Sequence, residues 1–378
     1  MAEEGTILFR HAFLHGNLST LFYLSDVSGY INIWLNVSTI FSNIVPLKYA
    51  PLVSVYLAFI LLIYIFFYIL FSTSHLLLDF KIKCVACSIV LFSPIMTAEV
   101  WLSPLNSMSY FGILTFLILF DKNHHTIFKK INPPLLLLSG LSGLYSSILT
   151  PLFFLKYIFS KNKHDLLNFS FLFLSFIIQL LIFIYAKTSD LVAPDRFFIN
   201  YEKIINFIYN APLKALFGRE ILQILIPLVN IQFAKILLLF FFLLFLIFLI
   251  LICVKKKDII IIYILVALLI ESLLIVFGSA YKEFAGGRYS VVPGAIILFS
   301  ILRLFLIFNY NKLKYFFLTL IIFSLTTGFL EFKYLNQYPN FLSCNNCPVW
   351  REQIDIWKKD HKYSIKIWPY PKYRVQLY

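Results

Sequence analysis

A few carboxylates stand where apolar stretches of this sequence begin or end, and they are the first candidates for chemistry. Glu3 and Glu4 open the chain, and Glu99 directly follows an apolar stretch. A carboxylate at a membrane boundary, partly desolvated and facing basic groups, can act as a general base or hold a divalent metal beside a phosphate. The alternative for any one of these acids is a solvated side chain at an interface with no chemical role.

A basic group suited to a phosphate occurs far downstream, in the segment SAYKEFAGGRYSVVP at 279–293. Two glycines let the backbone turn tightly before Arg288, whose guanidinium can form two parallel hydrogen bonds with a phosphate. Lys282 lies in the same segment. The alternative role for Arg288 is to anchor a helix end at a membrane interface, with Tyr289 in the aromatic belt.

Other polar residues carry weaker signals. His11 and His15 are four residues apart and would share one face of a helix, but a metal site needs a third ligand that is not offered at a fixed spacing. Glu271 lies inside an apolar stretch, where an acid is costly, so it is either functional or kept neutral or paired with another helix. Cys344 and Cys347 form a CNNC motif, for which a local disulfide is the preferred interpretation.

The composition indicates which kind of protein must position these residues. Of 378 residues, 61% are hydrophobic and 13% are charged, and the mean hydropathy is +0.86. An ordinary soluble domain has about half apolar and about a quarter charged residues, and a disordered chain would have far less apolar surface. The sequence therefore predicts an all-α, polytopic integral membrane protein.

Apolar windows of about 20 residues are the candidate membrane-spanning helices. Windows without Asp, Glu, Lys or Arg occur at 50–71, 100–120, 131–155, 166–186 and 236–254. Weaker windows, which are short or carry one charge, occur at 84–98, 258–278, 291–309 and 315–330.

Basic clusters set the orientation of these windows. The formal net charge is +14, and most of the excess lies in short loops near Lys81, Lys122, Lys156, Lys255 and Lys312. Since cytoplasmic loops carry the excess of Lys and Arg, we expect all five clusters to face the cytoplasm. This explains the charge without a nucleic-acid partner.

One arrangement places all five clusters on the same side, with about eight crossings and a hairpin of two half-length helices. The hairpin falls at 131–160, where Gly140, Gly143 and the Thr150–Pro151 step interrupt the apolar sequence. A single long helix with a proline kink is the alternative. The domains are then a transmembrane domain at 1–330, whose first exported segment is 1–49, and a small exported, aromatic and basic tail at 331–378.

Four motifs together resemble the GT-C superfamily of polytopic glycosyltransferases that use polyprenyl-phosphate sugars, of the aminoarabinose and mannosyl transferase type. They are AEEGTILFRHAFLHG at the start, MTAEVWLSPLNS around Glu99, SGLSGLYSSILTP in the predicted hairpin and GGRY at Arg288. The resemblance covers residues 1–330. That family has a transmembrane helix before the acidic motif, so either a first helix is missing here or the N-terminus is exported without one.

The resemblance implies an inverting glycosyltransferase in a bacterial inner membrane, with its active site on the exported face. It would move a sugar from a polyprenyl-phosphate donor to a lipid, glycan or protein acceptor, among membrane lipids. Glu4 or Glu3 would act as the base at the acceptor, and Glu99 would be a second acid beside the donor or a metal. The cofactor stays open, with a divalent metal at Glu99 as one alternative. The substrate-binding candidates are Arg288, Lys282 and Arg10.

A non-enzymatic transporter or lipid flippase is the competing interpretation. It would line a path across the membrane with polar groups such as Gln179, Glu271 and Arg303. Transporters are often built from repeated halves, and the sequence has no evident internal repeat, which favours the enzyme. A structural subunit of a membrane complex is a third interpretation, in which the tail would be the docking part.

Overall fold

The computed structural model describes residues 4–24, 29–96, 100–122, 126–189, 201–225, 231–278, 287–308, 311–334, 347–367 and 373–378. The first part contains a π-helix (Glu4–Phe9), α1 (Arg10–His15), α2 (Asn17–Leu21), α3 (Ile33–Ile44), a 3-10 turn (Leu47–Tyr49) and α4 (Ala50–Phe71). The next part contains α5 (Phe80–Phe92), α6 (Ser107–Leu119), α7 (Thr126–Leu141), α8 (Leu144–Ser147), α9 (Thr150–Ser160) and α10 (Lys163–Thr188).

The second half begins with α11 (Tyr201–Ile208), a π-helix (Tyr209–Leu213), α12 (Lys214–Phe217) and α13 (Arg219–Leu225). Four further helices, α14 (Ile231–Lys256), α15 (Ile259–Gly278), α16 (Val291–Ile307) and α17 (Asn311–Tyr334), follow, with a 3-10 turn (Gly287–Ser290) before α16. The tail contains α19 (Trp350–Lys359) and the strands β1 (Ile365–Lys366) and β2 (Arg374–Val375). The two strands pair antiparallel, with Ile365 opposite Val375.

Within the described ranges, six helices are long and apolar enough to cross a membrane. They are Leu47–Phe71, Lys163–Thr188, Leu239–Lys256, Ile259–Gly278, Gly287–Ile307 and Lys312–Phe332. Each one overlaps a window that the hydropathy pattern predicts. This is consistent with an all-α, polytopic membrane protein, and the fold class is confirmed at that level.

The helix at the predicted span 84–98 begins and ends earlier in the chain than predicted. Its helix, α5, begins at Phe80 because the side chain of Asp79 accepts a hydrogen bond from the backbone N–H of Ile82, at 2.9 Å, and caps the first turn. The helix ends at Phe92, before Ser93. It therefore has only 13 residues, which is about 20 Å of helix and less than the ~30 Å of a bilayer core.

The predicted span at 100–120 is also shorter. Its first part is not helical: Leu102 has a positive φ of 48°, and α6 begins only after Pro104, at Ser107. All 13 residues of α6 are buried. This helix therefore forms the centre of the core and is covered by other helices, whereas the sequence pattern alone suggested a span like the others.

The chain reverses direction between α7 and α9, as the hairpin prediction requires. Asp121, just before α7, contacts both arms of the hairpin. Its side chain accepts a hydrogen bond from Asn132 on α7, and its backbone carbonyl accepts one from Lys156 on α9, each at 3.0 Å. The turn contains Gly143, with a φ of 150°. A single kinked helix is therefore excluded, since it would carry Lys156 far from Asp121.

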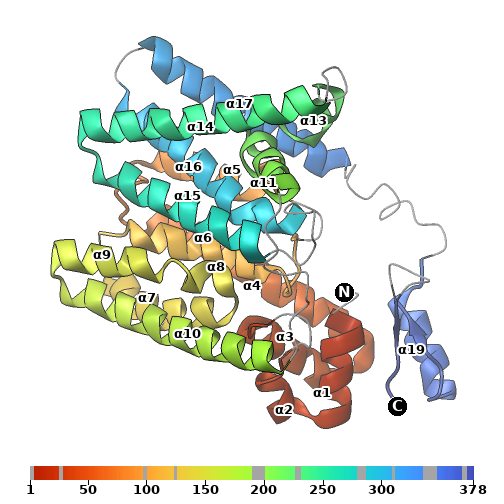
Figure 1. Cartoon of the computed structure of the whole chain (residues 1–378). Coiled ribbons are helices and arrows are strands. Elements are labelled where there is room, and N and C mark those ends of the chain that lie inside the picture. Colours follow the sequence, from red (N-terminus) through yellow and green to blue (C-terminus); the bar gives the residue numbers. More distant parts are fainter. Residues whose placement is uncertain are drawn as a thin grey trace.

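The five basic clusters lie at one end of the molecule, which we call the basic end. On the left of Figure 1, the junctions of α9 with α10 and of α14 with α15 lie on the same side. Arg303 near the end of α16 connects two clusters, since it pairs with Asp258 at 2.7 Å and donates to the carbonyl of His75 at 3.4 Å. Backbone pairing joins the loop before Lys81 to the loop of Lys122. The Lys122 N–H donates to the Thr73 carbonyl, the His75 N–H donates to the Phe120 carbonyl, and Ser74 forms a bridge with Asp121.

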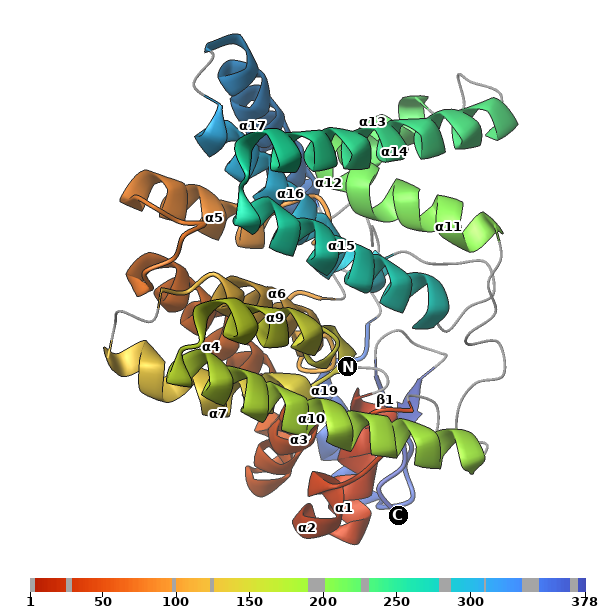
Figure 2. The same cartoon turned by 60° about the vertical axis from the view of Figure 1, so that its left-hand side comes forward.

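The tail packs against the first helices of the chain. In Figures 1 and 2, α19 and the strands lie beside α1 to α3. The indole N–H of Trp350 donates to the carbonyl of Leu47 at 2.9 Å. A small separate core joins both parts of the chain, made of Phe9, Ala50, Ile354, Ile365, Ile367, Val375 and Leu377. The boundary at 330 falls inside α17, which continues to Tyr334.

Candidate functional site

Glu4 is held in a defined orientation at the start of the first π-helix. Its side chain is buried, with 9% of its surface exposed. The Oε1 atom accepts hydrogen bonds from the backbone N–H of Leu105 at 2.9 Å and from the hydroxyl of Ser103 at 3.0 Å. Hydrogen bonds to a charged acceptor are about twice as strong as neutral ones. The non-helical segment before α6 thus provides the donors that orient this carboxylate.

A pocket of about 480 Å³ lies beside Glu4, and we call it the Glu4 pocket. One side is formed by the first π-helix, α3 and α4, and the other by Trp350 and Ile367 of the tail. Most of the surface is apolar, and three hydroxyl groups interrupt it. These belong to Thr39, Ser42 and Ser54, of which the last two are hydrogen-bonded to each other at 2.8 Å.

Arg288 lies in the 3-10 turn before α16, with its guanidinium carbon 5.5 Å from the ring centroid of Tyr289. Tyr289 lines a second pocket of about 420 Å³, which we call the Tyr289 pocket. Tyr30 and Tyr145 also line it, and the hydroxyl of Tyr145 donates to the carbonyl of Tyr289 at 3.5 Å. The guanidinium is thus placed at the border of a pocket rich in tyrosine.

The segment 103–108 connects the two pockets. Leu105 binds Glu4, and Met108, three residues further, lines the Tyr289 pocket and accepts a hydrogen bond from the hydroxyl of Tyr30 at 3.5 Å. Glu4 and Arg288 therefore lie toward the same end of the molecule. That end is remote from the basic end. Gln179 of α10 donates to the carbonyl of Ile31, next to Tyr30 of the Tyr289 pocket. It lies 16 residues after the start of α10 at the basic end, which is about 24 Å of helix.

The other predicted site residues are not placed in this constellation. Glu3, Glu99 and Lys282 lie outside the described residues. Arg10 is exposed at the start of α1 and is not among the residues that line either pocket. A metal at Glu99 therefore stays a prediction, and in the described part of the chain no three His, Cys, Asp or Glu side chains form a group suited to a metal ion.

The histidine pair forms a ring cluster on α1. The rings of His11 and His15 are 4.7 Å apart, and the ring of Tyr23 is 4.1 Å from that of His11. Burial, with a smaller contribution from the charge of His15, lowers the pKa of His11. A lowered pKa keeps the His11 imidazole neutral over more of the physiological pH range, in keeping with packing among rings.

The prediction of a disulfide at the CNNC motif is confirmed for Cys347 and stays a prediction for its pairing with Cys344. Cys347 is disulfide-bonded, while Cys344 lies outside the described residues. Cys84, Cys87 and Cys253 are free thiols. The CNNC motif, which lies in the tail, therefore contributes at least one cysteine to a disulfide.

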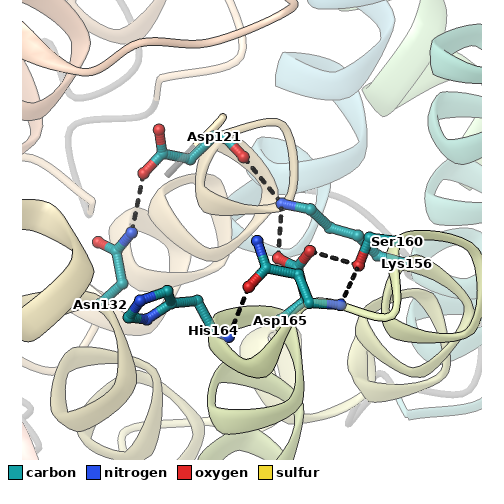
Figure 3. Close-up of polar contacts among 7 residues, drawn as sticks. Asp121, Asn132, Lys156, Ser160, His164 and Asp165 are labelled. Atoms are coloured by element: carbon teal, nitrogen blue, oxygen red, sulfur yellow. Dashed lines mark hydrogen bonds and ion pairs between the residues drawn. The ribbon is translucent and has the colours of Figure 1, made fainter. Parts of the chain in front are cut away.

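A buried polar cluster lies at the basic end, where the sequence indicated only loop charges. Figure 3 shows Lys156 between Asp121 and Asp165, with its ammonium 3.4 Å from the Asp165 carboxylate. The Ser160 hydroxyl donates to Asp165 at 2.6 Å, and Asn132 donates to the Asp121 carboxylate. The cluster ties α7, α9 and α10 together. Lys156 was read from the sequence only as a cytoplasmic charge, and no spacing rule links it to Asp121.

Two polar residues inside long helices have structural partners. The amide of Gln179 donates to the carbonyls of Ile31 and Gly140, at 3.0 and 2.9 Å, and accepts from the N–H of Ile31. This confirms its interpretation as a packing hydrogen bond. Arg303 is paired with Asp258, as described above.

Comparison with known proteins finds no matching family model, no matching curated protein and no matching solved structure.

Proposed function

We propose that this protein is a membrane glycosyltransferase that moves a sugar from a polyprenyl-phosphate donor to a lipid, glycan or protein acceptor. The observation that carries the proposal is the placement of a buried carboxylate, Glu4, and a guanidinium, Arg288, beside two pockets joined by one short segment. The five basic clusters gather at the other end, so the positive-inside rule puts this pair on the exported side.

The proposed reaction uses each group once. An acceptor hydroxyl attacks the anomeric carbon of the sugar from the side opposite the phosphate, and Glu4 takes the hydroxyl proton. The bond between the anomeric carbon and the phosphate oxygen breaks, and its electron pair leaves with the polyprenyl phosphate. The configuration at the anomeric carbon inverts. Arg288 stabilises the charge that develops on the departing phosphate. Stabilisation of this kind is usually the largest single contribution to catalysis.

The two pockets suit the two substrates. The Glu4 pocket is mainly apolar with three hydroxyl-bearing residues, so it fits an acceptor that has both an apolar part and a hydroxyl. The Tyr289 pocket has Arg288 at its border, so it fits the phosphate end of the donor.

Two of the three polar groups named for a transport path, Gln179 and Arg303, are engaged elsewhere. Gln179 is saturated by the backbone of Ile31 and Gly140, and Arg303 is paired with Asp258 at the basic end. Neither is available to line a path without breaking a buried contact. This favours the enzyme over the transporter or flippase.

A transfer assay tests the proposal. Purified protein is incubated with labelled undecaprenyl-phosphate sugars and membranes of the expressing host, and the labelled products are counted. We expect Glu4→Gln to lower kcat by about 10²–10⁴ through loss of the base, and Arg288→Ala to lower it by about 10²–10³ through loss of phosphate stabilisation.

Matched controls are available on the exposed surface of α19. Glu352→Gln and Arg351→Ala remove the same charges there, and we expect them to leave the rate within twofold. Transfer rates that stay unchanged in both Glu4→Gln and Arg288→Ala contradict the site assignment. Absence of transfer by the parent protein with every donor contradicts the proposed activity.

A further inference from the structure

Glu271 is a fully buried carboxylate without a partner. It lies in the middle of α15, none of its surface is exposed, and neither oxygen has a hydrogen-bond partner in the described part of the chain. Other buried acids differ, since Asp165 pairs with Lys156 and Glu331 accepts from the backbone N–H of Arg219. Buried charges are nearly always paired, because an unpaired one is expensive. Glu271 therefore needs an explanation outside the packing of α15.

The position of Glu271 on its helix points to the Tyr289 pocket. Residues three, four and seven positions apart share one face of a helix, and Leu274, Ile275 and Gly278 of α15 all line that pocket. Glu271 thus lies on the pocket-facing side of α15, one turn inward from the wall. Tyr145, another lining residue, is within electrostatic range of both Glu271 and Arg288.

The two groups suit different parts of a ligand. Arg288 at the border of the pocket attracts an anion, whereas the buried Glu271 carboxyl group forms hydrogen bonds with neutral polar groups such as hydroxyls. Tyr30, Tyr145 and Tyr289 contribute aromatic surface between them. A sugar joined to a phosphate has this pattern: an anion at one end, hydroxyl donors at the other, and C–H faces that pack against aromatic rings.

We propose that Glu271 binds the hydroxyl groups of the donor's sugar, with the Tyr289 pocket as the sugar subsite and Arg288 at the phosphate. This inference rests on the proposed glycosyltransferase function and assigns the substrate part that this pocket recognises. Glu271 is a substrate-binding residue here, and proton transfer remains with Glu4.

Equilibrium binding with two kinds of lipid separates sugar recognition from phosphate recognition. The purified protein in lipid nanodiscs is titrated with undecaprenyl phosphate, and with undecaprenyl-phosphate mannose, glucose and galactose. We expect the parent protein to bind at least one glycosylated lipid more tightly than the bare phosphate. Glu271→Gln should weaken binding of that lipid about 10-fold, the value of one or two hydrogen bonds, and leave binding of the bare phosphate unchanged.

Two further variants complete the design. Arg288→Ala should weaken both kinds of lipid alike. Glu331→Gln makes the same substitution in another buried carboxylate, on α17, which lines neither pocket, and it should change neither affinity. The Tm of Glu271→Gln should not fall below that of the parent, because no hydrogen bond within the described part of the chain is lost.

Each result has a defined meaning. Equal affinity of the parent for all glycosylated lipids and the bare phosphate overturns the sugar subsite, and so does a Glu271→Gln variant that binds the preferred lipid like the parent. A clear loss of Tm or of folding in Glu271→Gln overturns it too, since this would reveal a structural bond. If Glu4→Gln and Arg288→Ala still lower kcat in the transfer assay as expected, the proposed function stands without this subsite. If the parent binds none of the lipids, the proposed function falls as well.

Discussion

Gly143 has a backbone conformation that other residues adopt only with strain. Its φ is 150°, and a Cβ built on it would lie 2.5 Å from the Cβ of Met108. Met108 lines the Tyr289 pocket, so the turn of the hairpin presses directly against the candidate site. A side chain at 143 would have to displace α6, which is buried on all sides.

We therefore expect Gly143→Ala to lower the free energy of unfolding by about 1–3 kcal/mol from overpacking and a further ~1–3 kcal/mol from backbone strain. Gly16→Ala is the matched control, because Gly16 also has a positive φ, of 85°, but has no atom within 4 Å of a built Cβ. Thermal unfolding in the same detergent compares the two. Equal shifts in Tm would show that the contact with Met108 has no energetic cost.

The residue scale is also where prediction from the sequence was least complete. The pairing of Glu4 with Ser103 and Leu105 joins positions about a hundred residues apart, and no local pattern encodes it. The chemical type of the residue was predictable, because a carboxylate next to apolar segments is unusual. The hydrogen-bond donors to this carboxylate were not predictable. They depend on how residues 100–106 fold, and the hydropathy pattern predicted a helix there that the structure does not have.

Among the elements, the hairpin of α7 to α9 depends on the buried cluster at the basic end. Lys156 is the only cation in Figure 3 placed between two carboxylate-bearing residues, Asp121 and Asp165. Removing one partner of a buried ion pair leaves the other charge uncompensated, which typically costs 3–5 kcal/mol. The cluster is therefore expected to control whether α9 stays beside α10.

We expect Lys156→Met to lower the free energy of unfolding by about 3–5 kcal/mol. Lys163→Met, at the exposed start of α10, is the control and should change it by less than about 1 kcal/mol. Combining Lys156→Met with Asp165→Asn should recover part of the loss, because the uncompensated carboxylate is removed. Chemical denaturation followed by circular dichroism measures all three, and equal stability of the two single variants would argue against the cluster.

The elements show which sequence signals were sufficient. The hairpin was predictable because two independent signals indicate it. Glycines interrupt the apolar sequence at the turn, and the basic residues at both ends require those ends to lie on the same side of the membrane. The positions of α5 and α6 were not, since hydropathy alone does not mark where a helix starts. The capping side chain of Asp79 is a signal that would have moved the start of α5 to Phe80.

At the scale of the whole molecule, charge is divided between two ends. The basic end carries the five Lys-containing junctions, while Glu4, Arg288 and the tail are gathered remote from it. The six apolar helices run between these regions. This division was predictable from the positive-inside rule, because it depends on charge counts and not on contacts.

Labelling of single cysteines tests this division. In a background with Cys84, Cys87 and Cys253 replaced by serine, Arg10→Cys and Lys257→Cys each add one exposed thiol near opposite ends. We expect a membrane-impermeant maleimide to modify position 10 in intact cells, and position 257 only after permeabilisation. Modification of both positions in intact cells would show that the two ends are not separated by the bilayer.

The Glu4 pocket combines residues from the beginning and the end of the chain, so it can form only late in synthesis. Trp350 and Ile367 line the same pocket as Glu4, which leaves the ribosome almost 350 residues earlier. During translation the first helices stay incompletely covered until those late residues have been synthesised and have docked. A nascent chain arrested before that point would carry the six apolar helices of the described residues and still lack the side of the Glu4 pocket that the tail forms.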